Sequence, residues 1–237
     1  DKYYRTDAHW RQETLDETAA ALAGAMGVSL PAEYETVDTG LPFRGVYAGQ
    51  YALPVEPDAL AYRTNDTISR LRVYDYETAA EIPVYDLALA AGRDGYEMFL
   101  GGTKALLTIE NPAAATDREL VLFRDSFGNA LHEDLAESFG AATFSRAMPY
   151  DLSLLDDAQP DVLAVELVER NLRWLCTRPP ELPAPTREIA AEDAALSDQT
   201  IKLTKTASDW DGLVRYTATL DSVSPDATSP IYVLLNG

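Results

Sequence analysis

The sequence LVLFRDSFGNAL, residues 120–131, begins with an apolar run, breaks at a short polar turn and resumes with apolar residues at helical spacing. This pattern predicts a buried strand, a turn that carries Ser126, and a helix. The first N–H groups of a helix have no intrahelical acceptor, so a serine at this junction can present its hydroxyl beside free donors. Ser126 is therefore a candidate nucleophile. The alternative is that Ser126 or Asp125 only caps the helix.

A second polar motif is YYRTDAHW, at residues 3–10. A serine nucleophile needs a base to accept its proton and a carboxylate to orient that base. His9 and Asp7 are the candidates, because positions i and i+2 of an extended segment face the same side. The other of the two histidines, His132, stands among acidic residues and is interpreted as a solvated helix residue. Alternatively, His9 only packs beside Trp10 and Asp7 acts as a cap.

The chain carries four motifs in the order YYRTDAHW (3–10), YEMFLGG (96–102), FRDSFGN (123–129) and LVERNL (167–172). This order resembles that of the bacterial DHHW family, which is similar to the alginate O-acetyltransferase-like branch of the SGNH hydrolases. Ala8 occupies the second position of the Asp-His-His-Trp motif, whereas Asp7, His9 and Trp10 match it. The resemblance implies acetyl chemistry with Asp7, His9 and Ser126 as a triad.

The resemblance also implies an extracytoplasmic protein, at the cell surface or anchored in the membrane. We therefore expect a membrane anchor outside the given chain and a membrane O-acyltransferase as a partner. The sequence itself shows no signal peptide and no apolar segment long enough to span a membrane. It begins within a motif and closes on the apolar run 231–237, so we expect both ends to be cut from a longer protein.

Attack of Ser126 on an ester would develop negative charge that needs hydrogen-bond donors already in place. The candidate donors are the backbone N–H groups of Ser126 and Gly102 and the side chain of Asn129. Alternatively, Gly102 only belongs to a turn and Asn129 bonds the backbone at the helix start. Arg124 and Arg170 are the basic residues expected nearest the pocket. They either hold an anionic substrate group or pair with the acids beside them in the sequence, and pairing is the preferred interpretation.

The remaining pattern predicts an α/β fold. Four apolar runs predict strands of a central sheet, at 106–109, 120–123, 142–145 and 162–168. The second and fourth are apolar enough to be buried on both faces. Helical segments are predicted at 13–26, 129–139 and 152–155. The alternation implies parallel pairing, and with the resemblance it implies an SGNH-hydrolase-like three-layer fold with a mostly parallel sheet. Ser126 would then lie at the carboxyl end of a strand, where such sheets place their sites.

Four prolines in TRPPELPAP, residues 177–185, mark a domain boundary. We assign residues 1–177 to an SGNH-like catalytic domain that lacks its N-terminal part, residues 178–185 to a Pro-rich linker, and residues 186–237 to a truncated β-rich accessory unit. Three strands are predicted in this unit, at 200–205, 213–220 and 231–235. The unit is interpreted as an Ig-like or fibronectin-like spacer or as a carbohydrate-binding module.

Composition narrows the classes of partner. The chain has 237 residues, enough for a substantial core, and its 19 basic and 39 acidic residues give a net charge of −20. We therefore expect no nucleic acid and no anionic membrane surface as partners, and polyanionic glycans are disfavoured unless a local basic patch exists. The single Cys176 excludes an internal disulfide and is expected to be a small buried hydrophobe. With only two histidines, the chain is expected to hold no metal and no cofactor.

Together these observations predict a serine-dependent acetyltransferase or acetylesterase that acts on O-acetyl groups of an extracellular or cell-wall polysaccharide. Its substrates would be the polysaccharide or an acetyl donor. The alternative is a catalytically inactive SGNH-like surface module that binds glycan or serves a structural or adhesion role. The distances that join Ser126, His9 and Asp7 distinguish the two, because the enzyme requires His9 within hydrogen-bond reach of Ser126.

Overall fold

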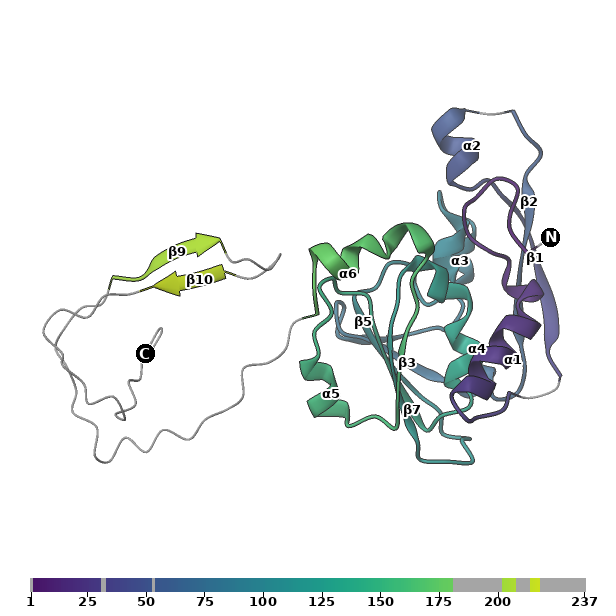
Figure 1. The fold of residues 1–237 in the computed structure, drawn as a ribbon. Coiled ribbons are helices and arrows are strands. Elements are labelled where there is room, and N and C mark those ends of the chain that lie inside the picture. The colour runs from purple at the N-terminus through teal and green to yellow at the C-terminus, as the bar shows by residue number, and fades with distance from the viewer. Residues whose placement is uncertain (1, 31–32, 53, 181–201, 208–213, 218–237) are drawn as a thin grey trace, which may run out of the picture. The chain divides into compact units, whose positions relative to one another are not determined.

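The computed structural model describes residues 2–30, 33–52, 54–180, 202–207 and 214–217 (Figure 1). The chain divides into two compact units, Asp1–Pro183 and Ala184–Gly237. The candidate site residues all lie in the first unit. Among the described residues, no helix combines the length and the apolar character needed to cross a membrane.

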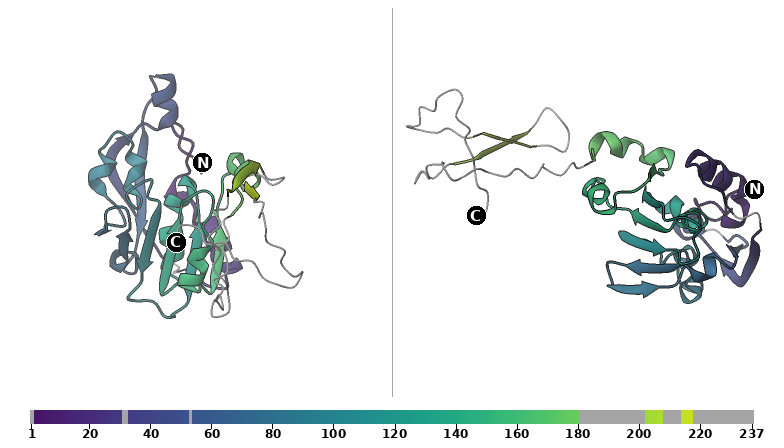
Figure 2. Two further views of the ribbon diagram at one scale, coloured as in Figure 1. Left: turned by 90° about the vertical axis from the view of Figure 1, so that its left-hand side faces the viewer. Right: turned by 90° about the horizontal axis from the view of Figure 1, so that it is seen from below.

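A six-stranded mixed sheet forms the centre of the first unit (Figures 1 and 2). Its strands lie in the order β4 (Ala80–Ile82), β3 (Arg72–Asp75), β5 (Leu106–Glu110), β7 (Ala141–Ser145), β6 (Glu119–Phe123) and β8 (Val162–Val165). β6 runs parallel to both β7 and β8, as the alternating pattern predicts. The other three neighbouring pairs are antiparallel.

The expectation of a mostly parallel sheet is therefore wrong. β5 runs antiparallel to β7, and β7 runs parallel to β6, so the chain reverses direction between β5 and β6. Residues 111–118 make that connection, and they are too few for the crossover of a dozen or more residues that parallel strands require. The fold is a mixed α/β arrangement.

Helices cover both faces of β6. Leu120 and Leu122 belong to the cluster on one face, with side chains of α1 (Asp16–Ala25) and α4 (His132–Ala136). Val121 and Phe123 point to the other face and pack with residues of α5 (Ser153–Ala158). In Figure 1, α5 accordingly lies on the opposite side of the sheet from α1 and α4.

β8 differs from β6, and the expectation that it is buried on both faces is wrong. Val162 and Ala164 pack against the core, whereas Leu163 is 48% and Val165 is 52% exposed. β8 is an edge strand with a neighbouring strand on one side only, and the cluster that covers Val121 and Phe123 of β6 does not extend over Leu163 and Val165.

The predicted helices form with changed bounds, and two of them have 3-10 turns at their starts. Segment 13–26 becomes η1 (Gln12–Thr14) and α1, whose C-cap Met26 is followed by Gly27 with φ of 70°. Segment 129–139 becomes η4 (Ser126–Ala130) and α4, and segment 152–155 becomes part of α5. The 3-10 helix η5 (Glu169–Asn171) and the short helix α6 (Arg173–Thr177) follow β8. Cys176 of α6 is exposed, so the expectation of a buried cysteine is wrong.

An antiparallel hairpin of β1 (Glu35–Phe43) and β2 (Asp58–Thr64) supports the N-terminal motif. Helix α2 (Val46–Tyr51) lies in its connection, and η2 (Ile68–Arg70), α3 (Leu87–Ala90) and η3 (Gly95–Met98) follow along the chain. A second core cluster joins these parts through the buried residues Tyr4, Phe43, Leu60, Ala90, Tyr96, Met98, Phe99 and Ala130. The cluster packs the N-terminal segment against η3 and against η4, the helix that carries Ser126.

In the second unit, β9 (Thr204–Ala207) and β10 (Val214–Thr217) form an antiparallel pair. β9 overlaps the strand predicted at 200–205, and β10 lies within the strand predicted at 213–220. The third predicted strand, at 231–235, and most of the predicted linker lie outside the described residues. The assignment of a catalytic domain, a linker and an accessory unit remains a prediction.

Candidate active site

Ser126 lies at the carboxyl end of β6, as the first residue of η4, and is half-buried. As the first residue of a 3-10 helix, its N–H has no acceptor within the helix. Outside that helix, none of the described residues accepts a hydrogen bond from it. The turn therefore presents both the hydroxyl and a free backbone donor at one point.

Asp125, rather than Ser126, caps this helix. Its Oδ1 accepts a hydrogen bond from the N–H of Phe127 at 2.9 Å. Its Oδ2 accepts from the N–H of Val168 at 2.9 Å and from the side-chain amide of Asn171 at 2.7 Å. Because Asp125 supplies the cap, the Ser126 hydroxyl is left for a different partner.

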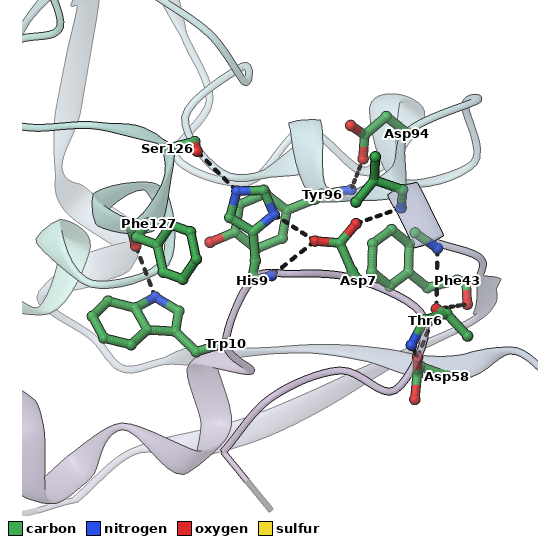
Figure 3. A network of polar contacts seen from close by, with 12 residues as sticks. Thr6, Asp7, His9, Trp10, Phe43, Asp58, Asp94, Tyr96, Ser126 and Phe127 are labelled. Atoms are coloured by element: carbon green, nitrogen blue, oxygen red, sulfur yellow. Dashed lines mark hydrogen bonds and ion pairs between the residues drawn. The ribbon is translucent and has the colours of Figure 1, made fainter. Parts of the chain in front are cut away.

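The N-terminal motif is a closed loop and not the extended segment expected from the sequence. Tyr3 and Trp10 pair in an antiparallel bridge that closes it. Asp58 of β2 holds the loop, since its Oδ2 accepts hydrogen bonds from Thr6 N–H at 2.8 Å and from Thr6 Oγ1 at 2.7 Å (Figure 3). The Trp10 indole N–H donates to the carbonyl of Phe127 at 2.7 Å, which ties the loop to η4.

Asp7 and His9 converge through a local turn. Asp7 Oδ1 accepts a hydrogen bond from the backbone N–H of His9 at 2.9 Å and lies 2.6 Å from His9 Nδ1. An aspartate that bonds the backbone two residues on forms an Asx turn, which brings the two side chains together without an extended backbone. Asp7 Oδ2 accepts from Val46 N–H, at the start of α2, at 2.7 Å.

The imidazole of His9 bridges Asp7 and Ser126 (Figure 3). Its Nε2 lies 2.9 Å from Ser126 Oγ. The ring stacks on Tyr96, with 4.1 Å between centroids and an interplanar angle of 13°, and contacts the Phe127 ring at 4.9 Å. The structure therefore brings the three predicted triad residues into one hydrogen-bonded chain, although 117 positions separate His9 from Ser126.

Charge and hydrogen bonding at Asp7 favour one tautomer of His9. Burial raises the pKa of Asp7, but hydrogen bonds from the His9 ring, from Val46 N–H and from His9 N–H more than offset it and hold the pKa below its usual value. An ionised Asp7 accepts from a protonated Nδ1, which leaves a lone pair on Nε2. That lone pair faces the Ser126 hydroxyl.

The other predicted oxyanion donors have partners of their own. Gly102 N–H donates to the carbonyl of Phe99 at 3.0 Å. Gly102 therefore belongs to a turn, which is the alternative to its role as an oxyanion donor. The Asn129 amide donates to the Gly102 carbonyl at 3.0 Å, and its oxygen accepts from Arg124. Asn129 therefore links two segments of the buried structure, and the N–H of Ser126 remains the donor nearest the hydroxyl.

Arg124 and Arg170 do not adopt the predicted pairing. Arg124 is buried, and its guanidinium donates to Asn129 Oδ1 and to the carbonyls of Asp125 and Lys104. Arg170 lies over the Phe127 ring at 5.3 Å and forms no ion pair within the described part of the chain. Both line a pocket of about 620 Å³ that opens beside Ser126.

Glu166 is a site residue that the sequence analysis missed. It follows β8 directly, and its Oε2 accepts from the N–H of Asp125 at 3.1 Å and also bonds the N–H of Gly128. Burial raises its pKa to about 7, and the charge of Asp125 adds to the effect. The predicted strand ran to residue 168 and placed Glu166 inside it. A predicted strand that ended before this first acidic residue would have placed Glu166 at the carboxyl end of the sheet, beside Ser126.

Gly45 was also missed. A Cβ added there would lie 2.2 Å from Cβ of Asp7, so only glycine allows the backbone to approach Asp7 this closely. No pattern around Gly45 signals this contact, because Asp7 lies far away in the sequence. Over the residues that the structure describes, no group of three or more His, Cys, Asp or Glu side chains is placed to hold a metal ion.

Solved structures share this fold, whereas no family model and no curated protein matches the chain. A DHHW family protein from Eubacterium siraeum DSM 15702 matches with a TM-score of 0.56 and 20% identity over 70% of this chain and 58% of that one. Bacillus cereus PatB1 matches with a TM-score of 0.58 and 20% identity over 73% and 64% of the two chains. PatB1 with a sulfonyl adduct gives a TM-score of 0.59 and 19% identity over 73% and 62%.

At this level of identity the likeness establishes a shared fold. The resemblance to the DHHW family that the four sequence motifs indicate is confirmed at that level. The chain spans about three fifths of the length of the structures it matches.

Proposed function

We propose that this chain is a serine-dependent acyl-ester enzyme with an SGNH-like fold, in which Ser126 is the nucleophile, His9 the base and Asp7 the residue that orients it. The observation that carries the proposal is the hydrogen-bonded chain from Asp7 through His9 to Ser126, with 2.6 Å and 2.9 Å between the bonded atoms. These lengths are those of hydrogen bonds between a nucleophile, its base and the orienting acid.

The reaction proceeds in two halves. His9 Nε2 takes the hydroxyl proton as Ser126 Oγ attacks the ester carbonyl carbon, and the carbonyl oxygen becomes an oxyanion. The intermediate collapses, the alcohol oxygen leaves with the proton held by His9, and an acyl-serine remains. Water or a glycan hydroxyl then attacks the acyl-serine and gives its proton to His9. Acetate or a new ester leaves, and Ser126 regains its proton.

The N–H of Ser126 is the donor best placed for the oxyanion. It is close to the attacking oxygen and makes no hydrogen bond outside its helix to a described residue. A donor already in place stabilises the developing charge without reorganisation. Ionised Asp7 stabilises the imidazolium that forms on His9 at the same time.

The proposed substrate is an O-acetyl group of an extracellular or cell-wall polysaccharide. The four sequence motifs and the fold shared with a DHHW family protein support this substrate class. The choice between hydrolysis and transfer depends on whether water or a glycan hydroxyl reaches the acyl-serine. An extracytoplasmic location, a membrane anchor outside the given chain and a membrane O-acyltransferase partner belong to the same proposal.

Turnover of p-nitrophenyl acetate tests the enzyme. We expect Ser126→Ala and His9→Ala to abolish hydrolysis above the background rate, because each removes a group that acts in the same step. His132→Ala is the matched control and should leave turnover near that of the wild type. Equal rates for the wild type and Ser126→Ala would overturn the proposal.

A covalent probe tests the nucleophile directly. PatB1 carries a sulfonyl adduct in one of its structures, and a sulfonyl fluoride adds to an activated hydroxyl with loss of fluoride. We expect phenylmethanesulfonyl fluoride to modify the peptide that contains Ser126, as read by mass spectrometry, and to leave Ser126→Ala unmodified. A folded wild-type protein that is neither modified nor active would favour the alternative of an inactive glycan-binding module.

A further inference from the structure

The pocket beside Ser126 is strongly basic. Four arginines line it, Arg124, Arg146, Arg170 and Arg178, and among the described lining residues only Asp125 is acidic. The Asp125 carboxylate is already held by the three donors of Phe127, Val168 and Asn171. This local excess of positive charge stands in a chain with 39 acidic and only 19 basic residues.

Arginines outside the pocket fall into two groups. Four form ion pairs with acids, Arg5 with Asp58, Arg11 with Glu13, Arg63 with Asp134 and Arg72 with Glu81. Among the other described residues, Arg44, Arg70, Arg93, Arg118 and Arg173 form no ion pair, but none of these five lines the pocket beside Ser126. Arg146, Arg170 and Arg178 also form no ion pair with any residue that the structure describes. In a chain whose acids outnumber its bases about two to one, three guanidinium groups without an ion pair to a described residue therefore line the same pocket, beside Ser126.

These arginines come from different elements. Arg146 follows β7 directly, Arg170 belongs to η5, and Arg178 is the C-cap that follows α6. Like charges that gather without a counter-ion repel one another, so the arrangement costs folding free energy unless an anion binds there. A guanidinium presents a planar fork of donors that matches a carboxylate or a phosphate. Trp174, half-buried in the same pocket, adds an aromatic face suited to the apolar side of a sugar ring.

We propose that Arg146, Arg170 and Arg178 form a subsite for an anionic group, a carboxylate or a phosphate, that the substrate carries next to the ester attacked by Ser126. An acetyl group is neutral, so the acyl chemistry alone does not account for these charges. The inference rests on the proposed function and narrows its substrate class to an acylated anionic saccharide. The arginines of this pocket would attract an anionic glycan locally, although the whole chain has a net charge of −20.

A matched set of acetyl esters tests the subsite. The esters are 3-acetoxybenzoate, its neutral methyl ester and 3-acetoxyphenyl phosphate, which share the acyl group and the aromatic leaving group. We expect the wild type to show a kcat/KM about tenfold or more higher for an anionic ester than for the neutral one, mainly through KM. The two anionic probes report whether a carboxylate or a phosphate fits better, and a preference for either supports the subsite.

Substitutions then test whether the arginines cause this preference. Arg146→Ala, Arg170→Ala and Arg178→Ala should each lower the ratio of kcat/KM for the anionic ester to that for the neutral ester about tenfold, while the rate on the neutral ester is unchanged. Arg93→Ala removes one positive charge from an exposed position outside the pocket lining and should leave the preference unchanged. Arg170 and Arg178 are exposed, so their replacement should preserve the fold, which a thermal melt checks.

Two outcomes overturn the subsite. Equal kcat/KM for anionic and neutral esters in the wild type would show that no anion is recognised. An equal loss on both esters in the arginine variants would assign the arginines to the reaction intermediate instead.

Binding separates this inference from the proposed function. Ser126→Ala lacks the nucleophile, so NMR titration of this variant with 3-acetoxybenzoate and with its methyl ester measures recognition alone. Preferential binding of the anion that is lost in Ser126→Ala/Arg170→Ala supports the subsite even if no ester is turned over. Equal binding of the two probes rejects the subsite and leaves the triad untouched.

Discussion

Gly45 shows at the scale of a single residue how a contact distant in sequence positions the carboxylate of Asp7. We expect Gly45→Ala to lower kcat about 100-fold, because the new Cβ would displace Asp7 and turn His9 away from Ser126. Gly49→Ala is the matched control, since nothing lies within 4 Å of a Cβ added there. The measurement is kcat on p-nitrophenyl acetate, with a melt to verify folding. Wild-type turnover in Gly45→Ala would show that the placement of Asp7 is unimportant.

Asn129 joins buried groups that its removal would leave without partners. We expect Asn129→Ala to cost roughly 1–3 kcal/mol of stability, because the carbonyl of Gly102 and the guanidinium of Arg124 each lose a hydrogen-bond partner. The folded fraction should keep turnover within a few-fold of the wild type. The opposite result would be an unchanged melting temperature with kcat about 100-fold lower. It would show that Asn129 acts as an oxyanion donor.

At the scale of elements, the anchoring of the N-terminal loop on β2 decides where His9 lies. Asp58 accepts hydrogen bonds from the N–H and the hydroxyl of Thr6 and from the N–H of Arg5. We expect Asp58→Ala to reduce kcat about tenfold or more and to speed hydrogen exchange in residues 3–10, because the loop loses its attachment.

The control for this change is Asp38→Ala, an exposed acid on the neighbouring strand β1. It removes the same charge from the same hairpin without touching the loop, so turnover and exchange should stay at wild-type values. Equal effects of the two substitutions would attribute the loss to the hairpin and not to the attachment.

Element prediction succeeded where the pattern was local. The apolar run at 120–123 formed β6, buried on both faces, and the parallel pairing of β6 with β7 and β8 followed from the intervening helices. It failed where the answer depended on neighbours. The direction of β5 depends on a connection too short for a crossover, and the exposure of Leu163 depends on a packing cluster that covers β6 but does not extend over Leu163.

For the whole molecule, titration of buried acids sets how stability varies with pH. Burial raises the pKa of Glu166 and of Asp134 to about 7, and raises that of Glu137 as well. Between about pH 4 and 7 the folded chain therefore binds more protons than the unfolded chain, so stability falls as pH rises. Asp7 and Asp58 have lowered pKa values and act oppositely, since the stability they contribute is lost as pH falls below their usual range.

We expect the melting temperature to be highest near about pH 5 and to decline towards pH 8. The net charge of −20 adds to this decline, because carboxylate repulsion grows as protons are lost. Glu166→Gln keeps an acceptor for the same N–H groups and removes the titration, so its decline should be shallower than that of the wild type. A melting temperature that rises between pH 5 and 8 would contradict the prediction.

The sequence by itself determined the chemical parts of the site and the local elements that carry them. Ser126 at a strand-to-helix junction and an acid two residues before His9 follow from spacing alone, because turns and caps depend on neighbouring residues. Only the tertiary structure decided how these parts meet. The loop geometry of Asp7, the use of Gly102 and Asn129 in other bonds, the contact at Gly45 and the arginines gathered beside Ser126 all depend on distant segments. Hydrogen bonds, steric contacts and electrostatic fields act over a few ångströms of space, and no pattern within one segment records which distant residue will lie that close.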